Sequence, residues 1–213
     1  MVDVYLDGPI TKESRLYNRE EMLLQQLRGK TLDVGCSGGR LLIKATILGH
    51  DIIGIDRDII KVREVKERAR ISGIDVNVIC ASSEDMPFPK ERFDTIVLGE
   101  VIEHTLEPDK LIIRMMKYLK SDGTLLITTP AGLAHFDSDH KSFFFSENAF
   151  DLFTKYWITE FFPFLWANMH SLIIMERMLN SIDCFYTLEE MTYGDSEHPS
   201  LDFFITITKK MNV

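Results

Sequence analysis

Short apolar runs alternate with amphipathic segments along the first two thirds of the chain. The apolar runs are bounded by glycine or acidic residues and predict strands over 31–35, 52–55, 76–80, 93–98 and 124–128. Between them, apolar residues at helical spacing predict helices over 12–27, 41–48, 58–72 and 108–119. Strands that alternate with helices predict a parallel sheet covered on both faces, which binds ligands at the carboxyl ends of its strands.

The last third of the chain has a different pattern. Residues 143–166 are dense in Phe, Tyr and Trp, and Ser146 is a plausible N-cap for a helix over 147–156. We predict a strand near 158–164, a further helix over 171–180 and a final strand over 202–208. The expected fold class is α/β: a doubly wound, mostly parallel, seven-stranded sheet with an aromatic-rich C-terminal insertion.

Composition narrows the classes of function. The chain has 213 residues, enough for one domain with a sizeable core, and a net charge of -9 that makes nucleic acid an unlikely partner. Its three cysteines give no disulfide framework and no metal spacing. We expect a cytoplasmic protein, since no apolar run is long enough for a transmembrane segment and the N-terminus does not resemble a signal peptide.

A glycine-rich turn follows the first predicted strand. Its sequence from Asp33 to Arg40 is D-V-G-C-S-G-G-R, in which the glycines allow the backbone to approach a ligand closely. The spacing is not the G-x-G-x-x-G of nicotinamide-binding folds, and a carboxylate precedes the first glycine. That carboxylate suits a cationic ligand better than a pyrophosphate. Asp56, at the end of the second strand, stands where an acidic residue binds a ribose diol.

The turn resembles the first motif of class I S-adenosylmethionine-dependent methyltransferases, D/E-x-G-x-G-x-G, with Ser37 at the middle glycine. Residues 81–88, 99–104 and 119–123 resemble later family stretches, so the resemblance covers 32–130. It implies a Rossmann-like methyltransferase fold that binds S-adenosylmethionine. Asp33 would hold the methionine amino group. The remaining implied cofactor residues are Gly35, Cys36, Ser37, Gly39, Asp56, Arg57, Ser82, Ser83, Glu84 and Gly99.

Three side chains after the fourth strand are candidates for the chemistry of methyl transfer. Glu100, Glu103 and His104 are spaced so that they can converge within one helical turn. The set resembles that of two metal-dependent families, the ubiquinone-biosynthesis O-methyltransferases and the small-RNA 2′-O-methyltransferases, which place a further His downstream. His140 could be that residue, giving a Mg²⁺ or Mn²⁺ site of Glu100, Glu103, His104 and His140. The alternative that we favour is metal-free, with His104 as the base.

We therefore predict an enzyme that methylates an oxygen of a small molecule such as a saccharide, quinone-like or lipid-linked acceptor. The alternatives are an RNA 2′-O-methyltransferase with a divalent metal and a non-catalytic methyltransferase-like partner subunit. Residues 1–213 would form one domain. Its parts would be an N-terminal helical lid over 1–28, a cofactor-binding half over 30–130 and a substrate-side half over 131–213.

Overall fold

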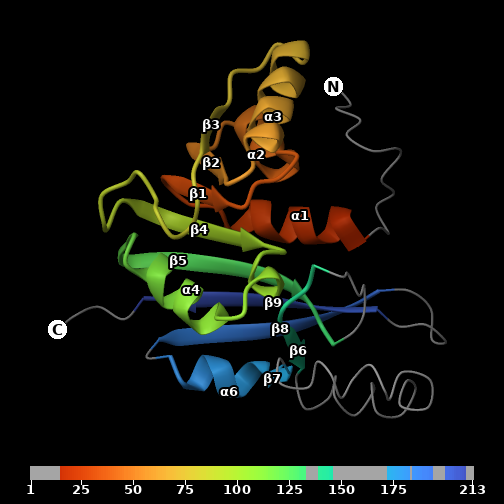
Figure 1. Cartoon of the computed structure of the whole chain (residues 1–213), viewed down its shortest axis with the longest axis vertical. Coiled ribbons are helices and arrows are strands. Elements are labelled where there is room, and N and C mark those ends of the chain that lie inside the picture. Colours follow the sequence, from red (N-terminus) through yellow and green to blue (C-terminus); the bar gives the residue numbers. More distant parts are fainter. Residues whose placement is uncertain (1–14, 133–138, 146–171, 183, 194–199, 210–213) are drawn as a thin grey trace.

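The computed structural model of the chain describes residues 15–132, 139–145, 172–182, 184–193 and 200–209. A seven-stranded sheet with the order β3-β2-β1-β4-β5-β9-β8 runs through the molecule (Figure 1). Its strands are β1 (Thr31–Val34), β2 (Ile52–Asp56), β3 (Asn77–Cys80), β4 (Phe93–Gly99), β5 (Leu119–Pro130), β8 (Phe185–Tyr193) and β9 (Ser200–Thr208). β9 alone runs opposite in direction to the other six strands of this sheet, which confirms the mostly parallel arrangement.

Helices cover both faces of the sheet. They are α1 (Arg15–Gln26), α2 (Arg40–Ile47), α3 (Ile59–Ile71), α4 (Pro108–Met116) and α6 (Met175–Asn180). Successive side chains of β4 point to opposite faces of the sheet. Ile96 belongs to the same apolar cluster as Ile112 of α4, whereas Val97 belongs to the cluster of Leu42 of α2 and Val62 of α3. Each face of this central strand therefore has its own apolar layer. Among the described residues, no helix is long and apolar enough to cross a membrane.

The strand order changes direction between β1 and β4. β1 leads through α2 to β2 on one side, while β4 pairs with β1 on the other side. At such a switch point the loops after the two strands diverge and leave a crevice at their carboxyl ends. The turn after β1 and the segment after β4 both lie there. The glycine-rich turn and the segment from Glu100 to His104 therefore meet at the carboxyl ends of the strands.

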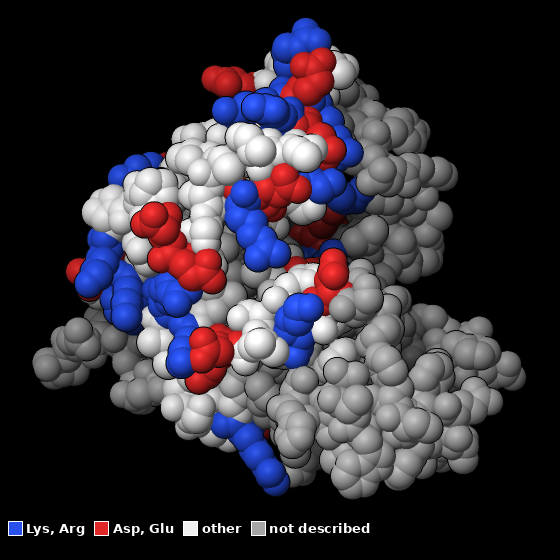
Figure 2. Space-filling view, viewed as in Figure 1, with Lys and Arg blue, Asp and Glu red and all other residues white. Residues whose placement is uncertain are grey.

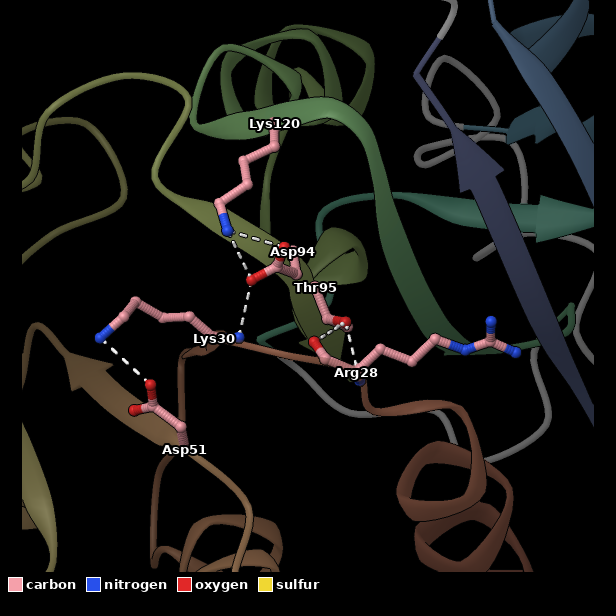
Figure 3. Close-up of polar contacts among 6 residues, drawn as sticks. All are labelled: Arg28, Lys30, Asp51, Asp94, Thr95 and Lys120. Carbon is pink, nitrogen blue, oxygen red and sulfur yellow. Dashed lines mark hydrogen bonds and ion pairs between the residues drawn. The ribbon is translucent and has the colours of Figure 1, made fainter.

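At the amino-terminal ends of these strands, polar contacts join the chain before β1 to the start of β4 (Figure 3). Asp94 accepts the backbone N–H of Lys30 at 2.8 Å and pairs with Lys120 Nζ at 2.7 Å. The Thr95 hydroxyl accepts the backbone N–H of Arg28 and donates to its carbonyl. These contacts fix the register of β1 against β4, and with it the relative position of the two loops at the other edge.

Several element predictions need correction. The seventh strand of the sheet is β8, not a strand near 158–164, a range that lies outside the described residues, as does the predicted helix over 147–156. The stretch predicted as a helix over 171–180 begins with the strand β7 (Leu172–Ile174), which pairs with β6 (Phe143–Phe145). α4 ends at Met116 and β5 already begins at Leu119, because Leu119 pairs with Phe93 of β4. Most of the expected aromatic-rich insertion also lies outside the described residues.

Candidate active site

The glycine-rich turn after β1 folds tightly against the end of β2. The backbone N–H groups of Gly35 and Cys36 both donate to the carbonyl of Ile55, at 2.8 and 3.0 Å. Gly35 has a φ of 73°, and a Cβ there would lie 2.8 Å from a methyl carbon of Val101. This position therefore requires glycine for both its backbone angle and its close approach. Ser37, which takes the place of the middle glycine of the motif, also has a positive φ, of 45°.

A cavity of about 470 Å³ opens beside this turn, at the switch point. Its walls come from the turn itself, from the helices α1, α2 and α3, and from the end of β4. The lining residues are Arg19, Glu20, Leu23, Asp33, Gly35, Cys36, Ser37, Gly38, Arg40, Leu41, Lys61, Arg68, Gly99 and Glu100. Charged groups of both signs face the same space, which suits a ligand that itself carries both charges.

Asp33 is the acidic side chain at the end of β1 and is only 4% exposed. Burial raises the pKa of Asp33 to about 7, and the negative charge of Asp56 adds to the effect. A carboxylate held in this unfavourable state would be stabilised by a ligand with a positive charge. The cavity therefore contains a buried group whose ionised form needs a cation.

Asp56, at the end of β2, is bound to the turn rather than to a side chain. Its two oxygens accept the backbone N–H groups of Ser37 at 2.8 Å and of Asp58 at 2.9 Å. A carboxylate has about four acceptor positions, so both oxygens retain capacity for the hydroxyls of a ribose. Asp58 itself caps α3 by accepting the N–H of Ile60, so it is committed to the helix.

The helix α1 is joined to the cavity by ion pairs. Arg19 lies 2.9 Å from a carboxylate oxygen of Glu100, and both side chains are mostly buried. Glu20 pairs with Arg40 at 2.6 Å, and Glu21 pairs with Lys44. Leu23 and Leu24 of the same helix, and Leu27 just after its end, are buried in the core. α1 is thus a fixed wall of the cavity on the side of β4.

A second group of polar side chains gathers just beyond β4. One ligand atom from each of Glu103, His104 and His140 lies within 4.8 Å of the others. The two imidazole rings meet edge to face with centroids 5.0 Å apart. The backbone N–H groups of Lys141 and Ser142 both donate to the carbonyl of Glu103, which holds the segment after 139 against the 3-10 helix Ile102–His104.

Glu103 is the buried member of this group. It is 2% exposed and accepts a hydrogen bond from the Thr129 hydroxyl at 3.1 Å, while its other oxygen has no hydrogen-bond partner among the described residues. Burial first, and the charge of Glu100 second, hold the pKa of Glu103 well above its usual range. His104 places Nδ1 3.4 Å from the carbonyl oxygen of Asp139, which can only accept. That contact favours the tautomer with the proton on Nδ1 and the electron pair on Nε2.

Glu100 lies close enough to act on Glu103 by its charge, but it does not belong to this ligand set. Glu100 precedes the 3-10 helix with a φ of 56°, and it lies in the cofactor-side cavity beside Arg19. The expectation that Glu100, Glu103 and His104 share one helical turn is wrong, because the turn starts only at Ile102. Among the described residues, Glu103, His104 and His140 form the candidate ligand set without Glu100.

The residues expected to bind the cofactor are divided between those that line the cavity and those that lie outside its lining. Five of them line the cavity: Asp33, Gly35, Cys36, Ser37 and Gly99. Gly39, Asp56, Arg57, Ser82, Ser83 and Glu84 lie outside its lining. Gly39 packs close to Val65 of α3, and Ser82 bonds with Glu84 within its own turn. The sequence interpretation did not identify Glu20, Arg40, Lys61 or Arg68 as cavity residues, and it considered Arg19 only as part of a lid.

Comparisons with known proteins agree with this geometry. Residues 32–127 match the family model described as "Methyltransferase domain". The ubiquinone biosynthesis O-methyltransferase of Rhodopseudomonas palustris (strain HaA2) is 32% identical over 116 residues, which are 54% of this chain and 46% of that protein. The chain thus matches about half the length of such curated relatives.

Two solved structures resemble the whole described fold. The YcgJ protein from Bacillus subtilis has a TM-score of 0.65 at 13% identity, covering 92% of this chain and all of that one. A SAM-dependent methyltransferase from Methanosarcina mazei has a TM-score of 0.62 at 16% identity, covering 90% and 98%. At these identities the likeness concerns the fold. Residues 32–127 thus match a methyltransferase domain, and the fold supports the class I S-adenosylmethionine-dependent type.

Proposed function

We propose that this chain is an S-adenosylmethionine-dependent O-methyltransferase acting on a small hydroxylated molecule, with a quinone-like ring as the acceptor. The observation that carries the proposal is the position of two sites around the end of β4. Gly99 and Glu100 line the cavity that contains Asp33, and Glu103 and His104 follow within one short turn. A methyl donor in the cavity and a hydroxyl at the second group would then be neighbours, as an in-line displacement requires.

The transfer forms an oxygen–carbon bond and breaks the carbon–sulfur bond, leaving S-adenosylhomocysteine. The acceptor hydroxyl must lose a proton as it attacks. His104 takes this proton at Nε2, since its contact to the Asp139 carbonyl leaves that nitrogen with the electron pair. Glu103, beside His104, orients the hydroxyl.

The same three side chains fit a divalent cation. Glu103 has a buried oxygen without a hydrogen-bond partner among the described residues, and one of its carboxylate oxygens lies within 4.8 Å of a ring nitrogen of each imidazole. One carboxylate and two imidazoles suit Mn²⁺ or a softer ion better than Mg²⁺. A bound ion would lower the pKa of the acceptor hydroxyl. The metal-free route through His104 remains the one that we favour.

The acceptor class is supported by similarity and by charge. The R. palustris protein is named for O-methylation in ubiquinone biosynthesis, and its match includes the β4 region. The net charge of -9 disfavours a polyanionic acceptor. In Figure 2, acidic and basic side chains are interspersed over the described part of the visible face, with no broad basic field. These features disfavour an RNA acceptor.

Turnover with methyl-labelled S-adenosylmethionine tests the proposal. The purified chain is incubated with a catechol bearing an apolar tail, a saccharide and a short RNA as separate acceptors. We expect label in the catechol product, with the loss of most of the activity in His104→Ala. An active-site control is Thr105→Ser, a conservative change of a neighbouring residue. Label in RNA or saccharide alone would contradict the acceptor class, and no transfer to any acceptor would favour a non-catalytic subunit.

A further inference from the structure

Arg19 is held between the cofactor cavity and Glu100. Its guanidinium lines the cavity and lies 2.9 Å from a carboxylate oxygen of Glu100, with the two side chains 12% and 20% exposed. A pair this protected from water interacts more strongly than a surface pair. Breaking it without a substitute partner would be costly, so any event that separates the two residues must offer Arg19 another anion.

The proposed cofactor carries such an anion at its amino-acid end. Its ammonium group pairs with a carboxylate such as Asp33, and its carboxylate needs a cation close by. Asp33 ends β1, and Glu100 directly follows β4, the strand that pairs with β1. Arg19 is therefore a cation on the β1–β4 side of the cavity, near the acidic group that would receive the ammonium.

The other cations of the cavity are less suited to this role. Lys61 and Arg68 belong to α3, which leads from β2 and lies on the side of Asp56. Arg68 donates to the Gly38 carbonyl at 3.0 Å. Arg40 pairs with Glu20 at 2.6 Å, which secures α1 against α2. The ion pair of Arg19 with Glu100 joins α1 to the segment that leads into the Glu103 group.

We propose that Arg19 binds the carboxylate of the cofactor and releases Glu100 in doing so. The proposal rests on the proposed function, because it assumes that S-adenosylmethionine occupies this cavity. Two anions then compete for one guanidinium, so Glu100 lowers the affinity for the cofactor and the cofactor displaces Glu100. Glu100 becomes available to the acceptor side only when the methyl donor is bound. Arg19 is thus a specificity-determining residue for the amino-acid end, and Glu100 is its competitor.

A purely structural role for the pair makes a different prediction. α1 is also held by Glu20–Arg40, by Glu21–Lys44 and by three buried leucines. The helix thus has anchors that do not depend on Arg19. If the pair served only to fasten α1, both Arg19 and Glu100 would support cofactor binding. If Glu100 and the cofactor carboxylate compete for Arg19, Arg19 raises the affinity for the cofactor and Glu100 lowers it.

Calorimetric titration with S-adenosylmethionine and with its decarboxylated form separates these roles, because the two ligands differ only in the carboxylate. Arg19→Gln should weaken binding of S-adenosylmethionine by about 10- to 100-fold, the range of a lost charge-assisted hydrogen bond, and leave the decarboxylated form nearly unchanged. Glu100→Gln should strengthen binding of S-adenosylmethionine several-fold without affecting the decarboxylated form. In the double variant Arg19→Gln/Glu100→Gln, the gain in affinity should be absent, because the guanidinium for which Glu100 competes has been removed.

The matched control is Glu21→Gln, which breaks another ion pair of α1 outside the cavity lining and should affect both ligands equally. Equal weakening of both ligands in Arg19→Gln would overturn the proposal. So would an unchanged or reduced affinity for S-adenosylmethionine in Glu100→Gln, and a gain of affinity cannot arise from misfolding. If the unmodified protein bound neither ligand, the cofactor assignment itself would fail, which is a distinct result.

Discussion

Ser37 donates its backbone N–H to a carboxylate oxygen of Asp56 at 2.8 Å, which joins the glycine-rich turn to the end of β2. This contact shapes the turn, and the same carboxylate is the expected acceptor for a ribose. Asp56→Ala should therefore weaken S-adenosylhomocysteine binding by about 1–3 kcal/mol. Calorimetry measures the change, and Asp58→Asn, which retains an N-cap for α3, is the control. An affinity unchanged in Asp56→Ala would mean that another group holds the ribose.

The buried Asp33 predicts a pH-dependent affinity. Its pKa is raised to about 7 in the free protein, whereas pairing with an ammonium group requires the ionised form. Affinity for S-adenosylmethionine should therefore fall by up to about tenfold per unit as the pH decreases below 7, and protons should be released on binding. Titrations between pH 5.5 and 8, in two buffers of different ionisation enthalpy, measure both effects. A constant affinity over this range would show that Asp33 does not pair with the cofactor.

The raised pKa of Asp33 also predicts that this residue lowers the stability of the folded chain, although cofactor binding requires it. In the unfolded chain Asp33 ionises near its ordinary value of 3.8, but in the folded chain it ionises near 7. Its contribution to stability therefore declines as the pH rises from about 4 to 7 and stays low above that range. Asp33→Asn should be more stable than the unmodified chain at pH 8, with little difference at pH 4.5, and should lose cofactor binding. Thermal unfolding at the two pH values tests this, and a variant that is less stable at pH 8 would contradict it.

Much of the cofactor side could be predicted from the sequence because its determinants are local. Buried parallel strands are apolar runs, as Ile52–Asp56 illustrates, and the motif from Asp33 to Gly39 lies within one strand–turn–helix unit. β8 was missed because it is an edge strand with exposed Phe185 and Glu189, so its pattern is mixed. The pairing of Arg19 with Glu100 depends on how α1 packs across the sheet, and no local pattern contains that information.

Chelation distinguishes the two mechanisms at the Glu103 group. If the favoured metal-free route is correct, EDTA should leave activity unchanged, His140→Ala should remain active and His104→Ala should not. Loss of activity in EDTA that Mn²⁺ restores, with Glu103→Gln and His140→Ala both inactive at near-normal cofactor affinity, would instead establish the ion. Elemental analysis of the purified protein provides a readout that does not depend on turnover.

The central claim is that the cavity at the switch point binds S-adenosylmethionine. Its most direct test is calorimetric titration of the free protein and of Gly35→Val with S-adenosylhomocysteine. The account predicts one site per chain in the unmodified protein and none in the variant, because any side chain at Gly35 would meet Val101 and fill the space beside the turn. Thermal unfolding should confirm that the variant is folded. Absence of binding to the unmodified protein, or normal binding to a folded Gly35→Val variant, would contradict the account.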